Sequence, residues 1–116
     1  MNLAKLTGFC AGLRDAQSDV KWGADLCYTI DAKMFAVFGT RDGKAFNVGF
    51  KCDPERFLEL TDQEGIIPAP YLAKAHWVLV EKPSALTDAQ ARALLRRSYE
   101  LIVAKLSKRR QRELLG

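Results

Sequence analysis

Residues 26–51 read LCYTIDAKMFAVFGTRDGKAFNVGFK, and this stretch predicts three consecutive antiparallel strands. Apolar side chains tend to recur at every second position, as they do in a strand with one buried face. The strands are expected at residues 26–30, 33–39 and 45–51. Asp31–Ala32 has the length of a two-residue turn, and residues 41–44 contain Asp-Gly, a pair that adopts the positive φ angles of a tight hairpin. The stretch therefore predicts the middle of an antiparallel sheet.

Segments on either side of this stretch predict further strands. A strand containing Val20 and Trp22 is expected before it, and a short strand at residues 76–81 is expected after it. Residues 66–72 hold two prolines and are expected to form an irregular connection, because proline has no N–H to donate to a sheet. We therefore expect about five strands.

Three helices are predicted from their capping residues and apolar spacing. Asn2 and Thr87 are the expected N-caps of the first and last helices, which should extend over residues 2–13 and 87–107. Asp53 is the expected N-cap of a middle helix. The residues expected to bury one side of the middle helix are Phe57, Leu58 and Leu60.

The composition is typical of one folded domain spanning residues 1–116, with 48% hydrophobic and 28% charged residues. No apolar run approaches the ~20 residues of a membrane-spanning helix, so no membrane association is expected. The three cysteines, Cys10, Cys27 and Cys52, lack C-x-x-C spacing and fit free thiols in the core of a cytoplasmic protein. His76 is the only histidine, and no nucleophile, metal-ligand or phosphate-loop motif accompanies it. We expect neither catalysis nor a cofactor.

Positive charge is concentrated near the C-terminal end of the chain. Residues 92–116 contain eight Lys/Arg and two Glu, whereas residues 1–91 contain ten Lys/Arg and twelve Asp/Glu. A concentrated basic segment attracts polyanions such as nucleic acids. The alternative interpretation is a solvated helix end, because cations stabilise the last turn of a helix through its dipole.

Several short segments, taken in their order along the chain, resemble the MmcQ/YjbR family. They are Trp22, Lys33–Met34–Phe35–Ala36, Phe50–Lys51 with Asp53–Pro54, Ile67–Pro68–Ala69–Pro70–Tyr71, Lys74, Trp77–Val78, and Ser98–Tyr99 with the basic segment that follows. The resemblance implies an α+β fold of the CyaY-like type, in which an antiparallel sheet of about five strands packs against N-terminal, middle and long C-terminal helices. It also implies DNA binding through two hairpin wings, without catalytic residues or a cofactor.

DNA binding without catalysis, and with little sequence readout, is the leading expectation for function. The residues expected to contact phosphates are Arg41, Lys44, Arg96, Arg97, Lys105, Lys108, Arg109 and Arg110. The alternative is a protein-interaction module built on the Pro-Ala-Pro loop, which predicts an exposed apolar patch near Tyr71 and binding that survives high salt. Core positions are otherwise expected for Tyr71 and Trp77. A small-molecule pocket between sheet and helices is a third class that these residues leave open.

Overall fold

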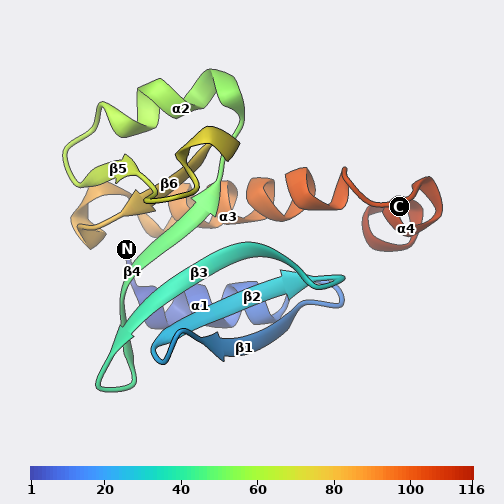
Figure 1. Cartoon of the computed structure of the whole chain (residues 1–116), viewed down its shortest axis with the longest axis horizontal. Helices are drawn as coiled ribbons and strands as arrows, with labels where there is room; N and C mark the ends of the chain where they lie inside the picture. The colour runs from blue at the N-terminus through green and yellow to red at the C-terminus, as the bar shows by residue number, and fades with distance from the viewer.

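The computed structural model describes all 116 residues and shows a six-stranded antiparallel sheet with four α-helices (Figure 1). The strand order across the sheet is β1-β2-β3-β4-β6-β5. The strands are β1 (Gln17–Lys21), β2 (Asp25–Ile30), β3 (Lys33–Arg41), β4 (Lys44–Lys51), β5 (Ile66–Pro68) and β6 (Trp77–Val80). The helices are α1 (Leu3–Ala11), α2 (Pro54–Thr61), α3 (Asp88–Val103) and α4 (Lys108–Leu115), with short 3-10 turns η1 (Ala73–Ala75) and η2 (Pro83–Ala85). The predicted α+β class and antiparallel sheet are confirmed.

The two central hairpins have the predicted two-residue turns. Ile30 pairs with Lys33 across Asp31–Ala32, whose φ angles are 50° and 66°. Across the β3–β4 hairpin, the turn residues Asp42–Gly43 have φ angles of 53° and 75°. Positive φ at both positions is the geometry of a type I′ turn, which matches the twist of the strands on either side. These turns set the pairing next to each hairpin end, and a register shift in each ladder then offsets the rest of β2, β3 and β4.

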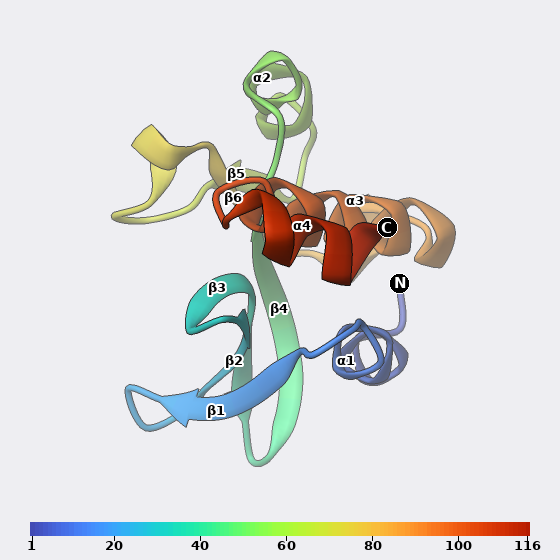
Figure 2. The ribbon, with the colours of Figure 1, turned by 90° about the vertical axis from the view of Figure 1, so that its right-hand side faces the viewer.

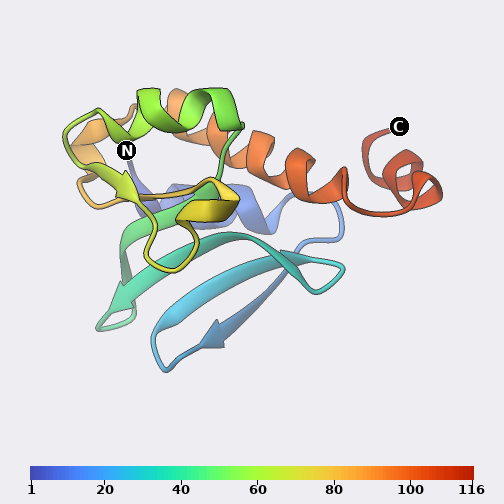
Figure 3. The same cartoon turned by 45° about the horizontal axis from the view of Figure 1, so that its top comes forward.

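The helices lie mainly on one face of the sheet. Figure 2 shows α1 and α3 on the same side of the strands, and no α-helix covers the opposite face. The helix-covered face holds one core cluster of 24 buried residues, to which α1, α3 and the central strands contribute. Figure 3 shows α2 above the β5–β6 end of the sheet. The face without helices is left open for contact with other molecules.

Ser98 joins α3 to both central strands. Its side chain is fully buried, its hydroxyl donates to the carbonyl oxygen of Phe35 at 2.7 Å, and it accepts the N–H of Lys51 at 3.0 Å. Phe35 lies next to a register shift between β2 and β3, and its ring packs edge-on against Tyr99 at a centroid distance of 5.3 Å. One serine therefore holds the helix in register with two strands.

All three predicted N-cap positions are confirmed, and two of them have a capping hydrogen bond to the side chain. Oδ1 of Asn2 accepts the N–H of Lys5 at 3.1 Å, and Thr87 forms a capping box with Gln90. Asp53 occupies the predicted N-cap position of α2, with a proline in the first turn, but its side chain makes no capping hydrogen bond. Its carboxylate instead pairs with a guanidinium of α3, described below.

The face assignment of the middle helix was partly wrong. Leu60 is buried and Phe57 is half-buried, as predicted, but Leu58 is 78% exposed. Leu58 lies one and two positions from these two residues. A helix turns by about 100° per residue, so three residues this close cannot all face the core.

The C-terminal basic segment forms a separate helix, which corrects the expectation that α3 continues to about Ser107. The helix α3 ends at Val103, and Ser107 then caps α4 by accepting the N–H of Arg110 on its hydroxyl oxygen at 3.1 Å. Lys108 and Arg109 therefore lie in the first turn of a helix. The helix dipole disfavours cations there, so the interpretation of these residues as a stabilising C-terminal turn does not hold.

The segment predicted to be irregular contributes the sixth strand. The strand β5 pairs antiparallel with β6, with Ile66 opposite Val80 and Pro68 opposite Val78. It occupies an edge of the sheet, where a strand that ends in proline is tolerated. No helix in the structure combines the length and the apolar character needed to cross a bilayer.

Candidate functional site

Arg97, one of the predicted phosphate contacts, is engaged by carboxylates. Its Nε and Nη2 atoms each donate to a carboxylate oxygen of Asp53 at 2.9 Å, and its Nη1 atom lies 3.4 Å from Oε1 of Glu100. Hydrogen bonding from the guanidinium holds the pKa of the Asp53 carboxyl below its usual value, and the same contact raises the pKa of Arg97. Arg97 therefore joins α3 to the start of α2 and is not free to meet a phosphate.

Arg110 is held by three carboxylates. It donates two hydrogen bonds to Asp31 and one to Asp15, all at 2.9 Å, and one to Glu113 at 3.1 Å. The hydrogen bonds from Arg110 lower the pKa of Asp31. Arg110 thus joins α4 to the β2–β3 turn and to the segment after α1, and its charge is balanced by carboxylates of the same chain.

The other predicted cations of the last two helices are more accessible. Lys105 and Lys108 are exposed and form no ion pair. Arg109 pairs with Glu113 at 3.2 Å, but its side chain is 85% exposed. Arg96 lies over the ring of Phe9, with its guanidinium carbon 5.7 Å from the centroid. These four side chains stay available to an anion at this end of the molecule.

The predicted cations of the β3–β4 hairpin lie apart from those of α4. Arg41 stacks over the ring of Phe46 at 4.3 Å, and Lys44 is exposed at the hairpin tip. Figure 1 places this tip and α4 at opposite ends of the molecule. The eight predicted residues therefore do not form one continuous basic surface.

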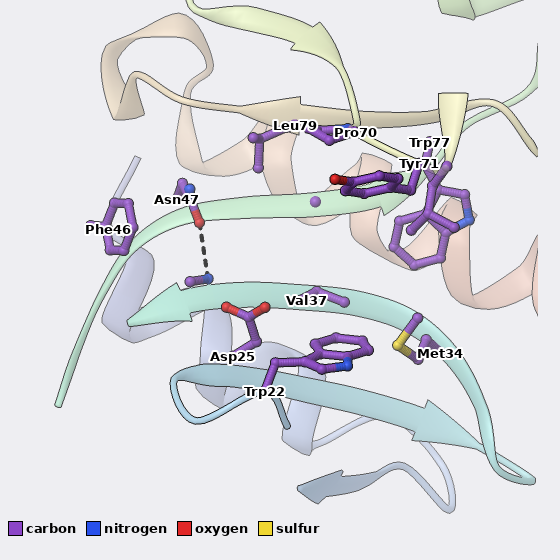
Figure 4. Close-up of a pocket in the computed structure, with 13 residues that line it drawn as sticks. Trp22, Asp25, Met34, Val37, Phe46, Asn47, Pro70, Tyr71, Trp77 and Leu79 are labelled. Carbon is purple, nitrogen blue, oxygen red and sulfur yellow. Dashed lines mark hydrogen bonds between the residues drawn. The ribbon is translucent and has the colours of Figure 1, made fainter. Parts of the chain in front are cut away.

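The open face of the sheet contains an apolar groove of about 620 Å³, called here the open-face groove (Figure 4). Most of its lining is hydrophobic. The lining residues are Trp22, Asp25, Met34, Val37, Gly39, Phe46, Asn47, Gly49, Pro70, Tyr71, Leu72, Trp77 and Leu79. A cavity of this size is within the ~300–1,000 Å³ range of ligand sites.

Two glycines in the strands form the floor of the open-face groove. Gly49 of β4 pairs with Val37 of β3 on one side and with Leu79 of β6 on the other. A Cβ added at Gly39 would lie 2.4 Å from Oδ1 of Asn47, which accepts the Gly39 N–H at 2.9 Å. The side chain of Asn47 therefore lies over Gly39, whereas Gly49 leaves the centre of the sheet face without a side chain of its own.

Trp22 and Tyr71 form opposite sides of the groove, and both have left-handed backbone conformations. Trp22 follows β1 with a φ of 52° and is 71% exposed, whereas Tyr71 precedes η1 with a φ of 67° and is fully exposed. The prediction that Tyr71 lies in the core was therefore wrong, because its left-handed backbone directs the ring out of the protein. Trp22 likewise lies in a turn and not in the predicted strand, whereas Trp77 is buried as predicted.

The two ends of the open-face groove differ in charge. Asp25 and Asn47 lie toward one end, and Met34 and Trp77 lie toward the other (Figure 4). Lys51 pairs with Trp77 across the β4–β6 ladder and donates from Nζ to the carbonyl oxygen of Ala75.

Lys51 also experiences the charge of a second lysine. The pKa of Lys51 is lowered by its partial burial and by the positive charge of Lys105. Lys51 does not line the groove, but its pairing with Trp77 places it beside one end, whereas the carboxylate of Asp25 lies toward the other end.

Sequence reasoning named part of this site without assembling it. Trp22, Tyr71 and Trp77 were assigned to the family pattern but come from three separate segments, and only the folded sheet brings them together. The other residues of the same pattern, Lys33, Phe35, Lys51, Pro68 and Lys74, do not line the groove, and Phe35 is buried in the core. The interior strand glycines Gly39 and Gly49 were the missed signal, because such glycines often mark a close approach to the backbone.

The chain is similar to one protein family model and to solved structures of bacterial proteins. A family model described as YjbR matches residues 11–101. A crystal structure of the Deinococcus radiodurans protein DR2400, which has the family domain DUF419, is 27% identical with a TM-score of 0.83, over 97% of this chain and 87% of that one. A Pseudomonas syringae protein is 22% identical with a TM-score of 0.67, over 87% of this chain and 98% of that one, and shows the fold alone. No curated protein was found to match.

Proposed function

Since this chain belongs to the YjbR family, we propose that it is a non-catalytic DNA-binding protein that holds phosphates through exposed lysine and arginine side chains. The observation that carries this proposal is the charge of residues 92–116, which contain eight Lys/Arg and two Glu. Cations grouped in this way neutralise phosphates and release the counterions condensed on DNA. Family membership supports the proposal by analogy only, because a fold does not fix a function.

The ion pairs described above narrow the set of residues that carry this function. Arg97 and Arg110 are committed to carboxylates inside the protein. The exposed cations of α3, α4 and their connection that form no ion pair are Arg92, Arg96, Lys105, Lys108 and Arg112. Phosphate contacts position a protein on DNA without reading its sequence, so we expect weak sequence preference.

The test is binding of the purified protein to a labelled duplex of random sequence at several salt concentrations. We expect affinity to fall steeply between about 50 and 200 mM salt, because each contacted phosphate contributes about 0.9 to the slope of the log–log plot. Lys105→Glu and Lys108→Glu should each weaken binding and reduce that slope by about 1. Fluorescence anisotropy measures both quantities.

A matched control is Lys5→Glu, which reverses an equally exposed charge on α1. Lys5 lies in α1, whose first residues contact the start of α3 through the hydrogen bond from the N–H of Asn2 to Asp88. Lys105 and Lys108 follow the other end of α3. Equal losses in all three variants would mean that only net charge matters. Unchanged binding in Lys105→Glu and Lys108→Glu would remove this phosphate surface from the proposal.

A protein-interaction role is the second candidate function, supported by the exposed apolar surface around Tyr71. Contacts of this kind depend on buried apolar area and are weakly screened by salt. A complex that persists at a salt concentration that removes DNA would favour this role. Three buried cysteine thiols support a reducing, cytoplasmic location in either case.

A further inference from the structure

We propose that the open-face groove binds unpaired bases of single-stranded DNA, stacked on Tyr71 and Trp22, with the adjoining phosphates directed toward Lys51. This inference rests on the proposed DNA binding and names the form of DNA that the groove takes. It starts from one juxtaposition: two exposed aromatic rings on either side of an apolar groove, with Lys51 beside the end that Trp77 forms.

The two rings are available for stacking. Tyr71 and Trp22 lie on opposite sides of the groove, and neither ring is buried by the rest of the chain (Figure 4). Single exposed aromatic residues are common on protein surfaces, but two that share one apolar hollow form an extended contact area. Every base presents a π-face, so base stacking on such rings tolerates any sequence.

The backbone conformation of both residues holds the rings in this arrangement. Bulky residues rarely adopt positive φ angles, yet Tyr71 and Trp22 both do so within the same site. Such conformations persist where the surrounding structure imposes them, and they gather at binding sites. The N–H of Leu72, the next residue, donates to the carbonyl oxygen of Ala69 at 3.1 Å and helps to fix the loop that carries Tyr71.

The charges around the groove favour a nucleic-acid strand over an apolar peptide. Lys51 shares the sheet face of Trp77 beside the groove, and Lys74 is exposed in η1, three residues after Tyr71. An apolar peptide gains nothing from these lysines, whereas a phosphate backbone does. Asp25 at the other end would repel a phosphate, but a carboxylate accepts hydrogen bonds from the amino group of a base.

Single-stranded DNA fits this surface better than a duplex does. A duplex hides the faces of its bases within the stack, whereas an unpaired strand can splay its bases onto aromatic side chains. The glycine floor of the groove lets a flat ring approach the backbone of β4. The α3–α4 cations can hold phosphates of either form, so they do not distinguish the two.

The test compares a labelled oligothymidine with a hairpin duplex of equal length, by anisotropy and by tryptophan fluorescence. We expect tighter binding of oligothymidine and quenching of Trp22, since Trp77 is buried. Tyr71→Ala should weaken oligothymidine binding by roughly 5-fold to 100-fold and leave duplex binding unchanged. Tyr71→Phe should bind as the native protein does, because it keeps the ring and loses only the hydroxyl.

Leu58→Ala is the matched control, because it removes an equally exposed apolar side chain from α2, outside the groove. The proposal is overturned if Tyr71→Ala and Trp22→Ala bind oligothymidine as well as the native protein, or if an uncharged apolar peptide occupies the groove and oligothymidine does not. Duplex binding that depends on Lys105 and Lys108, without preference for oligothymidine, would overturn this inference and leave the proposed function standing. Binding of neither DNA at low salt would overturn both.

Discussion

At the residue scale, positive φ angles mark both the tight turns and the groove. Of the seven non-glycine residues with positive φ, three are aspartates, whose short polar side chains tolerate this region. Ala32 has no such compensation, although its φ of 66° is set by the turn between β2 and β3. Trp22 and Tyr71 carry the same conformation at the groove. Unlike Trp22 and Tyr71, Ala32 does not line the groove, so it can be replaced by glycine without loss of a contact surface.

We expect Ala32→Gly to stabilise the protein by about 0.5–1 kcal/mol. Glycine removes the ~1–2 kcal/mol penalty of a left-handed L-residue, and part of this gain is lost to the greater entropy of the unfolded chain. Urea unfolding measures the difference. Ala24→Gly is the control, since Ala24 lies in a neighbouring turn without a positive φ, and a gain of equal size there would contradict the explanation.

We expect Ser98→Ala to lower the free energy of unfolding strongly, although it removes only one hydroxyl group. In Ser98→Ala the carbonyl of Phe35 and the N–H of Lys51 lose their buried partner. Unpaired buried groups cost about 1–3 kcal/mol each, so the free energy of unfolding should fall by at least that amount. Thermal and urea unfolding check this value against Ser84→Ala, an exposed serine. A loss no greater than that of the control would show that water replaces the hydroxyl.

Local residue patterns were predictable from the sequence, and contacts between distant residues were not. Asn2, Thr87 and Asp42–Gly43 act within three or four residues of themselves, so their conformations follow from their own chemistry. Asp53 has the composition of a cap, but its carboxylate is taken by Arg97, which lies 44 positions away. No local pattern records that choice.

At the element scale, the Asp53–Arg97 ion pair makes the attachment of α2 to α3 sensitive to acid. The pKa of Asp53 is lower in the folded protein than its ordinary value, so the unfolded chain binds more protons as the pH falls. The contribution of this pair to stability is complete above the ordinary aspartate pKa of about 3.9 and is lost as the pH falls through the lower folded-state value.

We therefore expect Asp53→Asn to be less stable than the native protein near neutral pH, with a difference that shrinks below about pH 4. Urea unfolding across this range measures the difference in free energy. Asp19→Asn is the control, because Asp19 is exposed on β1 and forms no ion pair. A gap between native protein and Asp53→Asn that stays constant on acidification would exclude the ion pair as its cause.

Two element boundaries show where the sequence pattern stops being informative. The apolar spacing of the last helix extends through Leu106, but Ser107 competes as an N-cap and starts a new helix. The three residues of β5 have too few positions to show an alternating pattern, and their pairing with β6 depends on tertiary packing. The two prolines of residues 66–72 were the local signal, and they predicted an irregular connection in place of a strand.

At the scale of the whole molecule, α4 closes the structure over its N-terminal segment. Leu114 is buried in the core, and Nη1 of Arg14 donates to the carbonyl oxygen of Glu113 at 2.7 Å. The carbonyl of Arg14 in turn accepts the hydroxyl of Tyr99 at 2.7 Å. These contacts join residues from both ends of the chain, which explains why the basic segment is an ordered helix and not a frayed tail.

We expect deletion of residues 108–116 to destabilise the protein and weaken DNA binding together. Burial of Leu114 contributes about 1.5–3 kcal/mol, which the deletion removes along with the contacts of Arg110. The deletion takes away four Lys/Arg and one Glu, so the formal net charge falls from +4 to +1. Thermal unfolding and anisotropy report the two effects. Leu114→Ala separates them, because it should reproduce the loss of stability without the loss of affinity.

The residue types and the charge of the candidate site were predictable from the sequence, but the spatial arrangement of its residues was not. The charge of residues 92–116 is visible in the sequence, but the pairing of Arg110 with Asp15 and Asp31 is not. The open-face groove depends on the strand order that places β6 beside β4, which no local pattern specifies. The charged surface was thus expected, and the hollow aromatic surface emerged only with the sheet.

The two outermost strands have features that disfavour pairing of the sheet with another molecule. Exposed strand edges invite pairing between molecules, and natural sheets blunt them with charges, prolines or short strands. The edge strand β1 carries Asp19 and Lys21, while β5 has only three residues and ends at Pro68, which has no N–H to offer. Neither border is a good template for another chain, so the sheet can leave one broad face uncovered without stacking edge to edge into aggregates.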